Sequence, residues 1–231
     1  IEDLFSVEVM DESILLDEGL LTYLGDDMSE RYTDQLRQIL IEGDYDKSLS
    51  IVYSPLHGAG GELVCKGLKE AGFENVTVVA EQAIPDPDFS TVEYPNPEES
   101  KAFDLALPYG RKVNADILIA TDPDADRMGL AVLNKTGDYV FLTGNQIGAL
   151  LLSTLLEDKK NQNTLPNHGV VIKSIVTSEL GPAIADSYNV KMMNELTGFK
   201  SISEEIEKFH QTKASKFIFG CEASVGYLIG D

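Results

Sequence analysis

The chain has 231 residues, of which 43% are hydrophobic, and a formal net charge of −21 at neutral pH. This length allows one large domain or two smaller ones, with enough apolar content for packed cores. The strong negative charge excludes nucleic acid as a partner, because a phosphate backbone requires Lys and Arg, and it disfavours anionic membranes.

The sequence is typical of a cytoplasmic protein. No segment reaches the ~18 consecutive apolar residues of a membrane span, and the acidic first residues, IED, do not resemble a signal peptide. Cys65 and Cys221 are far apart and in no metal-binding spacing, so we interpret both as reduced core residues.

Residues 1–25 form no complete folding unit, and a predicted helix follows them. Residues 1–25 are irregular and acidic, and we expect them to be the tail of something larger. Residues 26–40 predict a helix, because Met28, Tyr32 and Leu36 follow helical spacing and acidic residues stand in its first turn.

Short apolar strands and helices alternate over the rest of the chain. In the first half we expect strands at 49–53, 76–80, 116–120, 129–133 and 139–142, with helices at 61–71 and around Pro108. In the second half we expect strands at 169–176, 190–193 and 216–221, with helices at 143–156, 179–188 and 198–210. The pattern predicts an α/β fold of two similar three-layer α/β/α units with mixed, mostly parallel sheets. We place their boundary near Gly137.

Three aspartates at alternate positions follow the predicted strand 116–120. Asp122, Asp124 and Asp126 would repel one another unless a cation lies between them, and Mg²⁺ or Ca²⁺ takes oxygen ligands only. Arg127 follows directly and offers a bidentate fork for phosphate. A metal ion beside an arginine is typical of phosphoryl transfer, where catalysis depends on charge stabilisation and positioning.

Other interpretations of this loop exist. An EF-hand is excluded, because its sixth position requires Gly and its twelfth Glu, whereas the chain has Arg127 and Leu133. A solvated acidic turn remains open. A phosphatase of the haloacid dehalogenase type, with Asp122 as nucleophile, also remains open.

Four motifs together resemble the α-D-phosphohexomutase family, which contains phosphoglucomutase and phosphomannomutase. TDPDADR (121–127) resembles the family's metal-binding loop, and YSPLHGAGG (53–61) the loop that opens its second domain. NELTGFKSI (194–202) is similar to a loop of the third domain, and FGCEASVGYLIGD (219–231) to its sugar-binding loop. The resemblance is strongest to the Gram-positive bacterial branch called phosphoglucomutase.

The resemblance implies that the chain is a fragment. Family members have four domains; the first carries a phosphorylated serine and the fourth binds the substrate phosphate, and neither motif is present here. The expected divisions are 1–25, the tail of domain 1; 26–137, domain 2; and 138–231, domain 3 without its end. Domains 1 and 4 would be the missing partners.

The resemblance also implies roles for individual residues. Asp122, Asp124 and Asp126 would bind Mg²⁺, and Arg127 would orient the phosphoryl group. The predicted substrate-binding residues of the third domain, which would surround a phosphorylated hexose, are Thr197, Gly198, Lys200, Glu222 and Ser224.

The implied reaction interconverts glucose 1-phosphate and glucose 6-phosphate through a phosphoserine and a hexose 1,6-bisphosphate, and we expect the fragment alone to be inactive. Phosphomannomutase activity is the near alternative; a non-catalytic cation-binding module is one of another class. Two further residues keep two interpretations: His57 would pack a turn or approach the phosphoryl site, and Lys173 would point into a cleft or pair with an acid. Tyr227 is the nearest counterpart of a proton-shuttling histidine.

Overall fold

A computed structural model describes residues 9–41 and 45–230 of the chain. The chain divides between Gln38 and Ile39 into two compact units. Among the described residues, no helix combines the length and apolar character needed to cross a bilayer.

The first unit contains α1 (Glu12–Asp17) and nearly all of α2 (Asp26–Ile39). The helix expected at 26–40 is therefore confirmed, whereas the segment expected to be irregular contains α1. The Tyr23 hydroxyl donates a 2.7 Å hydrogen bond to Glu12. Residues 1–8 of the predicted tail lie outside the described residues.

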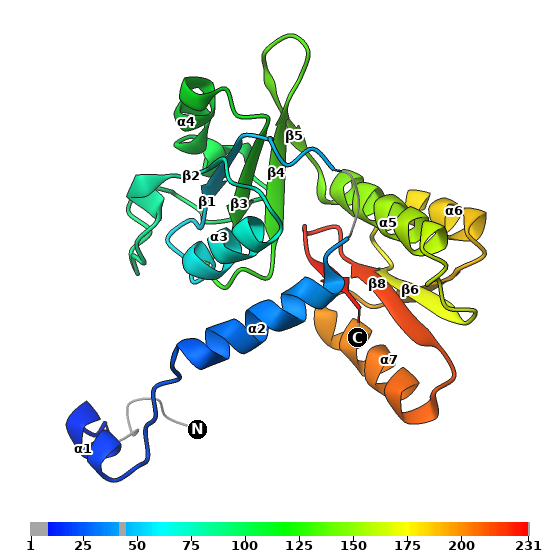
Figure 1. Cartoon of the computed structure of the whole chain (residues 1–231), viewed down its shortest axis with the longest axis horizontal. Coiled ribbons are helices and arrows are strands. Elements are labelled where there is room, and N and C mark those ends of the chain that lie inside the picture. Colours follow the sequence, from blue (N-terminus) through cyan, green and yellow to red (C-terminus); the bar gives the residue numbers. More distant parts are fainter. Residues whose placement is uncertain (1–8, 42–44, 231) are drawn as a thin grey trace. The chain divides into compact units, whose positions relative to one another are not determined.

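The second unit begins with a five-stranded mixed sheet in the order β2-β1-β3-β4-β5 (Figure 1). β1 pairs with β2 and β3 in parallel, whereas β4 and β5 continue the sheet in antiparallel pairing. The strands are β1 (Ile51–Ser54), β2 (Val76–Val78), β3 (Ile117–Thr121), β4 (Met128–Leu133) and β5 (Tyr139–Leu142). The helical segments are α3 (Gly61–Glu70), η2 (Ala80–Gln82), η3 (Ser100–Phe103) and α4 (Ala106–Val113).

The predicted boundary near Gly137 falls within one hairpin of the first sheet. Gly137 occupies the turn between β4 and β5, and Leu130 of β4 is paired with Leu142 of β5. The first sheet therefore extends to Leu142. In a sequence, a glycine turn between two short strands looks the same whether it ends a domain or joins neighbouring strands. The strand pairing in the structure shows that this turn joins β4 to β5.

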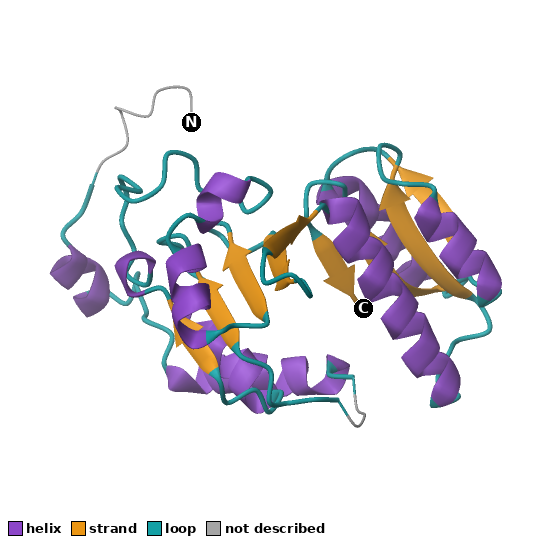
Figure 2. Ribbon diagram, turned by 90° about the horizontal axis from the view of Figure 1, so that it is seen from above, coloured by secondary structure: helices purple, strands orange, loops and turns teal. Residues whose placement is uncertain are grey.

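A four-stranded sheet follows, in the order β7-β6-β8-β9. Its strands are β6 (Gly169–Ser174), β7 (Lys191–Glu195), β8 (Lys216–Cys221) and β9 (Tyr227–Ile229), of which β9 is antiparallel. Its helices are α5 (Gly144–Asn161), α6 (Leu180–Ser187) and α7 (Phe199–Thr212). Figures 1 and 2 show helices on both sides of these strands. The prediction of two α/β/α units with mixed sheets is confirmed, although the sequence interpretation missed β9.

The two faces of the second sheet have separate apolar cores. Val171 packs with the α5 and α6 side chains, whereas Val170 packs with Ile202 of α7, as the alternation of side chains in a strand requires. A bulge changes the alternation in β8, because Val170 faces Phe217 and the next residue, Val171, faces Phe219. Phe217 therefore joins the α7 core and Phe219 the opposite one. Because of the bulge, side chains after Phe217 in β8 alternate in the opposite sense, up to the end of the strand directly before Glu222.

Candidate functional site

The three predicted metal ligands lie in the loop between β3 and β4. This loop turns back on itself, because Asp122 O accepts from the Ala125 amide at 3.0 Å and Asp122 Oδ1 accepts from the Arg127 amide at 3.0 Å. Ala125 adopts the left-handed region, with φ at 58°. The turn directs alternate side chains toward the same place.

The carboxylates of Asp122, Asp124 and Asp126 converge. One oxygen from each lies within 4.8 Å of the others. Asp122 is buried, with 8% of its surface exposed, whereas the other two are exposed. Arg127 Nε lies 3.9 Å from Asp122 Oδ2 and 3.8 Å from Asp126 Oδ1. One guanidinium thus offsets part of three negative charges, and the donor set suits a hard divalent cation.

The pKa of the Asp122 carboxyl is raised to about 6. Burial is the largest cause, and the neighbouring carboxylates of Asp126 and Asp124 act in the same direction. The amide of Arg127 acts in the opposite sense by donating to the carboxylate. Two of the three physical causes of a pKa shift, desolvation and like charge, therefore act together at this residue.

The loop that follows β1 holds the aspartate loop in place. Ala59 N donates to Pro123 O at 2.8 Å. A Cβ placed on Gly58 would lie 2.5 Å from both the Cα and the O of Pro123, so only glycine permits this approach. The Tyr53 hydroxyl and Thr121 Oγ1, directly before the aspartates, are 2.9 Å apart. Tyr53, Gly58 and Ala59 belong to the motif at 53–61, but the sequence alone does not predict their supporting contacts.

His57 has a packing role in the same loop. Its Nδ1 lies 2.9 Å from Ile84 O and its Nε2 lies 2.7 Å from Thr91 Oγ1, and the residue is 6% exposed. Both ring nitrogens are thus engaged in joining this loop to the proline-rich segment 84–100. The contacts favour the interpretation of His57 as a residue that packs a turn.

Glu222, the main predicted sugar ligand, lies in the turn between β8 and β9. It is 7% exposed, and its Oε1 accepts a hydrogen bond from the Gly198 amide at the start of α7. Its own amide donates to Gly226 O at 3.0 Å. The structure therefore brings Glu222 and Gly198, two predicted substrate residues from separate motifs, into direct contact.

The remaining predicted substrate residues are more exposed. Ser224 is half-buried beside Glu222 in the sequence, and Thr197 is exposed beside Gly198. The Lys200 side chain is 90% exposed, and its Nζ lies 4.0 Å from Glu204 one turn further along α7. Lys200 is therefore held only by a surface ion pair, which leaves its ammonium accessible.

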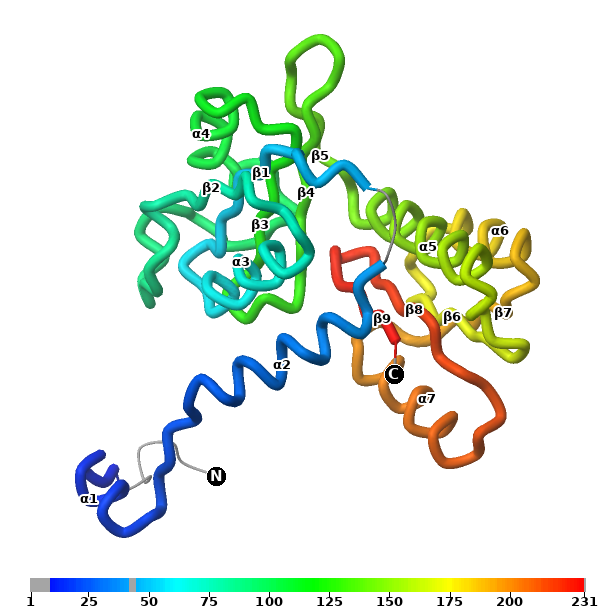
Figure 3. Tube along the Cα trace, viewed as in Figure 1, coloured from blue at the N-terminus to red at the C-terminus, as the bar shows by residue number. Residues whose placement is uncertain are grey.

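Direct backbone contacts join the aspartate loop to the Glu222 loop. Met128 N donates to Val225 O at 3.0 Å, and Arg127 forms an antiparallel bridge with Gly226. A Cβ on Gly226 would lie 2.6 Å from the Phe199 ring, so this ring packs directly on the bridge. Figure 3 shows the tip of the β8–β9 hairpin reaching the chain at the start of β4. In the sequence, the residues that mark this junction are Gly226 in the motif 219–231 and Phe199 in the motif 194–202.

Lys173 has an acidic partner. It is 1% exposed, and its Nζ donates to Thr177 O and to Glu179 Oε1, both at 3.0 Å. The interpretation of Lys173 as paired with an acid is thus confirmed. Lys173 also stands opposite Cys221 in the sheet register. Burial raises the pKa of the Cys221 thiol to about 11, which keeps the residue before Glu222 in its neutral form.

Tyr227, the residue that stands where a proton-shuttling histidine was expected, has a hydroxyl that is engaged with the backbone. Its hydroxyl donates to Gly144 O at 3.0 Å, at the start of α5. Burial raises the pKa of Tyr227, so the phenol holds its proton at neutral pH. Its ring stacks on Phe219, and the residue thereby fixes the base of the Glu222 turn.

The sequence matches two family descriptions that together span most of the chain. Residues 30–136 match the phosphoglucomutase/phosphomannomutase alpha/beta/alpha domain II, and residues 143–231 match domain III. The chain belongs to the phosphoglucomutase/phosphomannomutase family. This family membership excludes the alternative that the chain is a phosphatase of the haloacid dehalogenase type.

Curated relatives of the family include bacterial phosphoglucomutases. The protein of that name from Staphylococcus haemolyticus (strain JCSC1435) is 40% identical over 203 residues, covering 87% of this chain and 36% of the relative. The one from Staphylococcus aureus (strain N315) is 42% identical over 182 residues, covering 78% and 32%. The chain thus spans about a third of these relatives, and both come from Gram-positive bacteria, the predicted branch.

Solved structures share the fold at lower identity. A phosphoglucomutase/phosphomannomutase family protein from Burkholderia thailandensis has a TM-score of 0.65 and 17% identity, covering 87% of this chain and 39% of that one. The Aspergillus fumigatus N-acetylphosphoglucosamine mutase in complex with GlcNAc-6P and magnesium has a TM-score of 0.56 and 12% identity, covering 87% and 36%.

The raised pKa of Asp122 predicts a pH dependence of stability in metal-free solution. Unfolded Asp122 ionises near its ordinary pKa of about 3.9, whereas the folded residue keeps its proton to about 6. Relative to Asp122→Asn, the protein therefore loses stability as the pH rises from about 4 through 6, because ionisation of the buried carboxyl costs more in the folded state. Urea unfolding of both proteins in EDTA, on either side of the window, measures it. An equal difference in stability at both ends would contradict the prediction.

The packing of Phe199 on Gly226 predicts that Gly226→Ala is destabilising. The added methyl group would overpack the bridge, at a cost of about 1–3 kcal/mol in the free energy of unfolding. Gly61→Ala is the control, because the nearest atoms to its Cβ would be 3.7 Å away. Phe199→Leu should relieve part of the cost, so the two substitutions should combine non-additively. Strict additivity in urea unfolding would show that the ring and the bridge are independent.

Proposed function

We propose that this chain is the central part of a phosphoglucomutase that interconverts glucose 1-phosphate and glucose 6-phosphate. The observation that carries the proposal is the junction of the aspartate loop with the Glu222 loop through Arg127 and Gly226. A module that only bound a cation would have no need of a buried carboxylate from a second sheet beside its metal loop.

The proposed domain arrangement follows the family matches and the sheets. Residues 1–25 are the end of a phosphoserine domain, and the next part, proposed as 26–137 from the sequence, is domain II. The pairing of β5 in the first sheet extends this part to Leu142. The remaining residues belong to domain III. No counterpart of the phosphoserine motif stands in these 231 residues, so we expect this chain by itself to be inactive.

Asp122, Asp124 and Asp126 are the proposed ligands of Mg²⁺. The fit rests on their convergent oxygens, whose mutual repulsion a hard divalent cation would relieve. The bound ion would supply positive charge that stabilises the phosphoryl group during transfer. The A. fumigatus neighbour was solved with magnesium, which supports the same metal here.

The chain's own residues position the sugar and the phosphoryl group. The Arg127 guanidinium, 41% exposed, orients the phosphoryl group. Glu222 accepts hydrogen bonds from sugar hydroxyls; each carboxylate oxygen has two lone pairs, so it does this while holding Gly198. The other proposed sugar contacts are Ser224, Thr197, Gly198 and Lys200.

The proposed reaction needs the same residues twice. The phosphoserine of the first domain transfers its phosphoryl group to a hydroxyl oxygen of the bound hexose phosphate, and the proton of that hydroxyl is released. The resulting hexose 1,6-bisphosphate reorients in the site, and its other phosphoryl group is transferred back to the serine. The isomeric hexose phosphate then leaves as the product. Glu222 reads the sugar in both orientations. Because hydroxyls at C3 and C4 do not distinguish glucose from mannose, phosphomannomutase activity is the second candidate.

Removing the Glu222 charge should impair catalysis in a protein that also carries the other two domains. A lost charge-assisted hydrogen bond costs roughly 1.5–3 kcal/mol, so Glu222→Gln should lower kcat/KM for glucose 1-phosphate about 10- to 100-fold. Glu157→Gln is the matched control, on the exposed surface of α5. Mannose 1-phosphate as a competitor ranks the two sugars.

The same assay tests the fragment. The 231-residue chain alone should give no turnover, because it brings no phosphoserine. Turnover by the isolated chain, or equal kinetics for Glu222→Gln and Glu157→Gln, would overturn the proposed function.

A further inference from the structure

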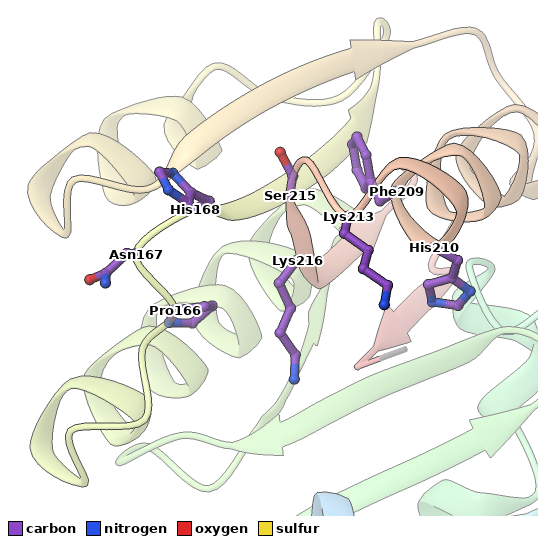
Figure 4. A pocket seen from close by; sticks show the side chains of 8 residues that line it. All are labelled: Pro166, Asn167, His168, Phe209, His210, Lys213, Ser215 and Lys216. Atoms are coloured by element: carbon purple, nitrogen blue, oxygen red, sulfur yellow. The ribbon is translucent and has the colours of Figure 1, made fainter.

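A cavity of about 500 Å³ lies at the end of the second sheet where β6 and β8 begin. Glu222 follows the other end of β8, so the length of the strand separates the cavity from the proposed sugar site. Figure 4 shows the residues that line it, which come from the segment before β6, the end of α7 and the start of β8. They are Pro166, Asn167, His168, Phe209, His210, Lys213, Ser215 and Lys216.

The cavity is basic in a strongly acidic protein. The chain has 39 Asp and Glu against 18 Lys and Arg and only three histidines. Of the described residues that line the cavity, two are lysines, two are histidines and none carries a carboxylate. The field of the whole chain repels anions, so a patch of this composition is where an anion would bind.

The walls of the cavity are fixed by backbone contacts. Lys216 N donates to His168 O at 3.0 Å, which joins the start of β8 to the segment before β6. Lys213 ends α7 with φ at 54° and donates its amide to Phe209 O at 2.7 Å. Glycine or asparagine is usual at such a left-handed helix end. The chain therefore accepts an unfavourable backbone conformation at a residue whose ammonium group borders the cavity.

Apolar surface accompanies these charges. Phe209 is half-buried and packs with the α7 core, and Pro166 lines the opposite wall. The volume falls in the range of about 300–1,000 Å³ that is common for small-molecule sites. In Figure 4 the side chains of Lys213, Lys216 and His210 extend in one direction and the ring of Phe209 in the other.

We propose that this cavity binds a small phosphate monoester with an apolar body. Lys213 and Lys216 contact the phosphate as point charges, and the imidazole of His210 borders the same oxygens. Pro166 and Phe209 contact the apolar body. The site lies apart from the aspartate and Glu222 loops and takes a ligand that need not be the sugar on which the proposed enzyme acts.

Titration of the ¹⁵N-labelled chain with phenyl phosphate tests this site by amide chemical shifts. We expect saturable shifts at His168, His210, Lys213 and Lys216, weakened by added salt because the charges are exposed. Inorganic phosphate should bind more weakly, since it lacks the apolar body, and phenol alone should cause no shifts there. The double variant Lys213→Gln/Lys216→Gln should weaken binding of phenyl phosphate at least about tenfold.

The control Lys135→Gln/Lys191→Gln makes the same change of charge at exposed lysines outside the cavity and should bind as the unaltered chain does. Equal losses in the two double variants would show a general charge effect and overturn the site. Equal affinities for inorganic phosphate and phenyl phosphate would overturn the assignment to a monoester with an apolar body. The readout uses no mutase activity, so its failure is distinct from failure of the proposed function.

Discussion

Mutual repulsion among Asp122, Asp124 and Asp126 is the constraint that the site has to satisfy. Their oxygens converge within 4.8 Å, with a single guanidinium nearby. Hydrogen bonds within the loop and the Arg127 guanidinium offset part of this repulsion, and further support comes from the neighbouring loop, where Gly58 closes on Pro123. The rest of the first sheet positions these two loops at the ends of β1 and β3. A tight backbone clamp thus holds charges in a geometry that a bound cation would complete.

The second half of the site depends on the same clamp. Because Arg127 bridges Gly226, the turn that ends the aspartate loop also positions the Glu222 turn. Phe199 covers this bridge, and the adjacent Gly198 amide holds the Glu222 carboxylate. The loop of aspartates that would bind metal and the Glu222 loop that would bind sugar are therefore held by one network of backbone contacts. A displacement at either loop has a direct path to the other.

Local patterns predicted what is local. The alternation of aspartates after a buried strand indicated their convergence, and helical spacing indicated α2. Features that depend on pairing are harder to predict: the three residues of β9 form a strand only against β8, and the sheet pairing of β5 with β4 is not visible in the sequence around Gly137. The acid that pairs with Lys173 was equally hidden, because Glu179 is reached only through the turn that follows β6.

The occupancy of the aspartate loop by a divalent cation is the central claim, and a Mg²⁺ titration of the chain near neutral pH tests it most directly. Amide shifts should saturate with one site, centred on residues 122–127. Asp124→Asn should abolish this site, because it removes one of three converging ligands. Asp88→Asn, which removes an exposed carboxylate from another turn, should leave it intact. Binding that is equal in both variants, or that shifts only residues elsewhere in the chain, would contradict the account.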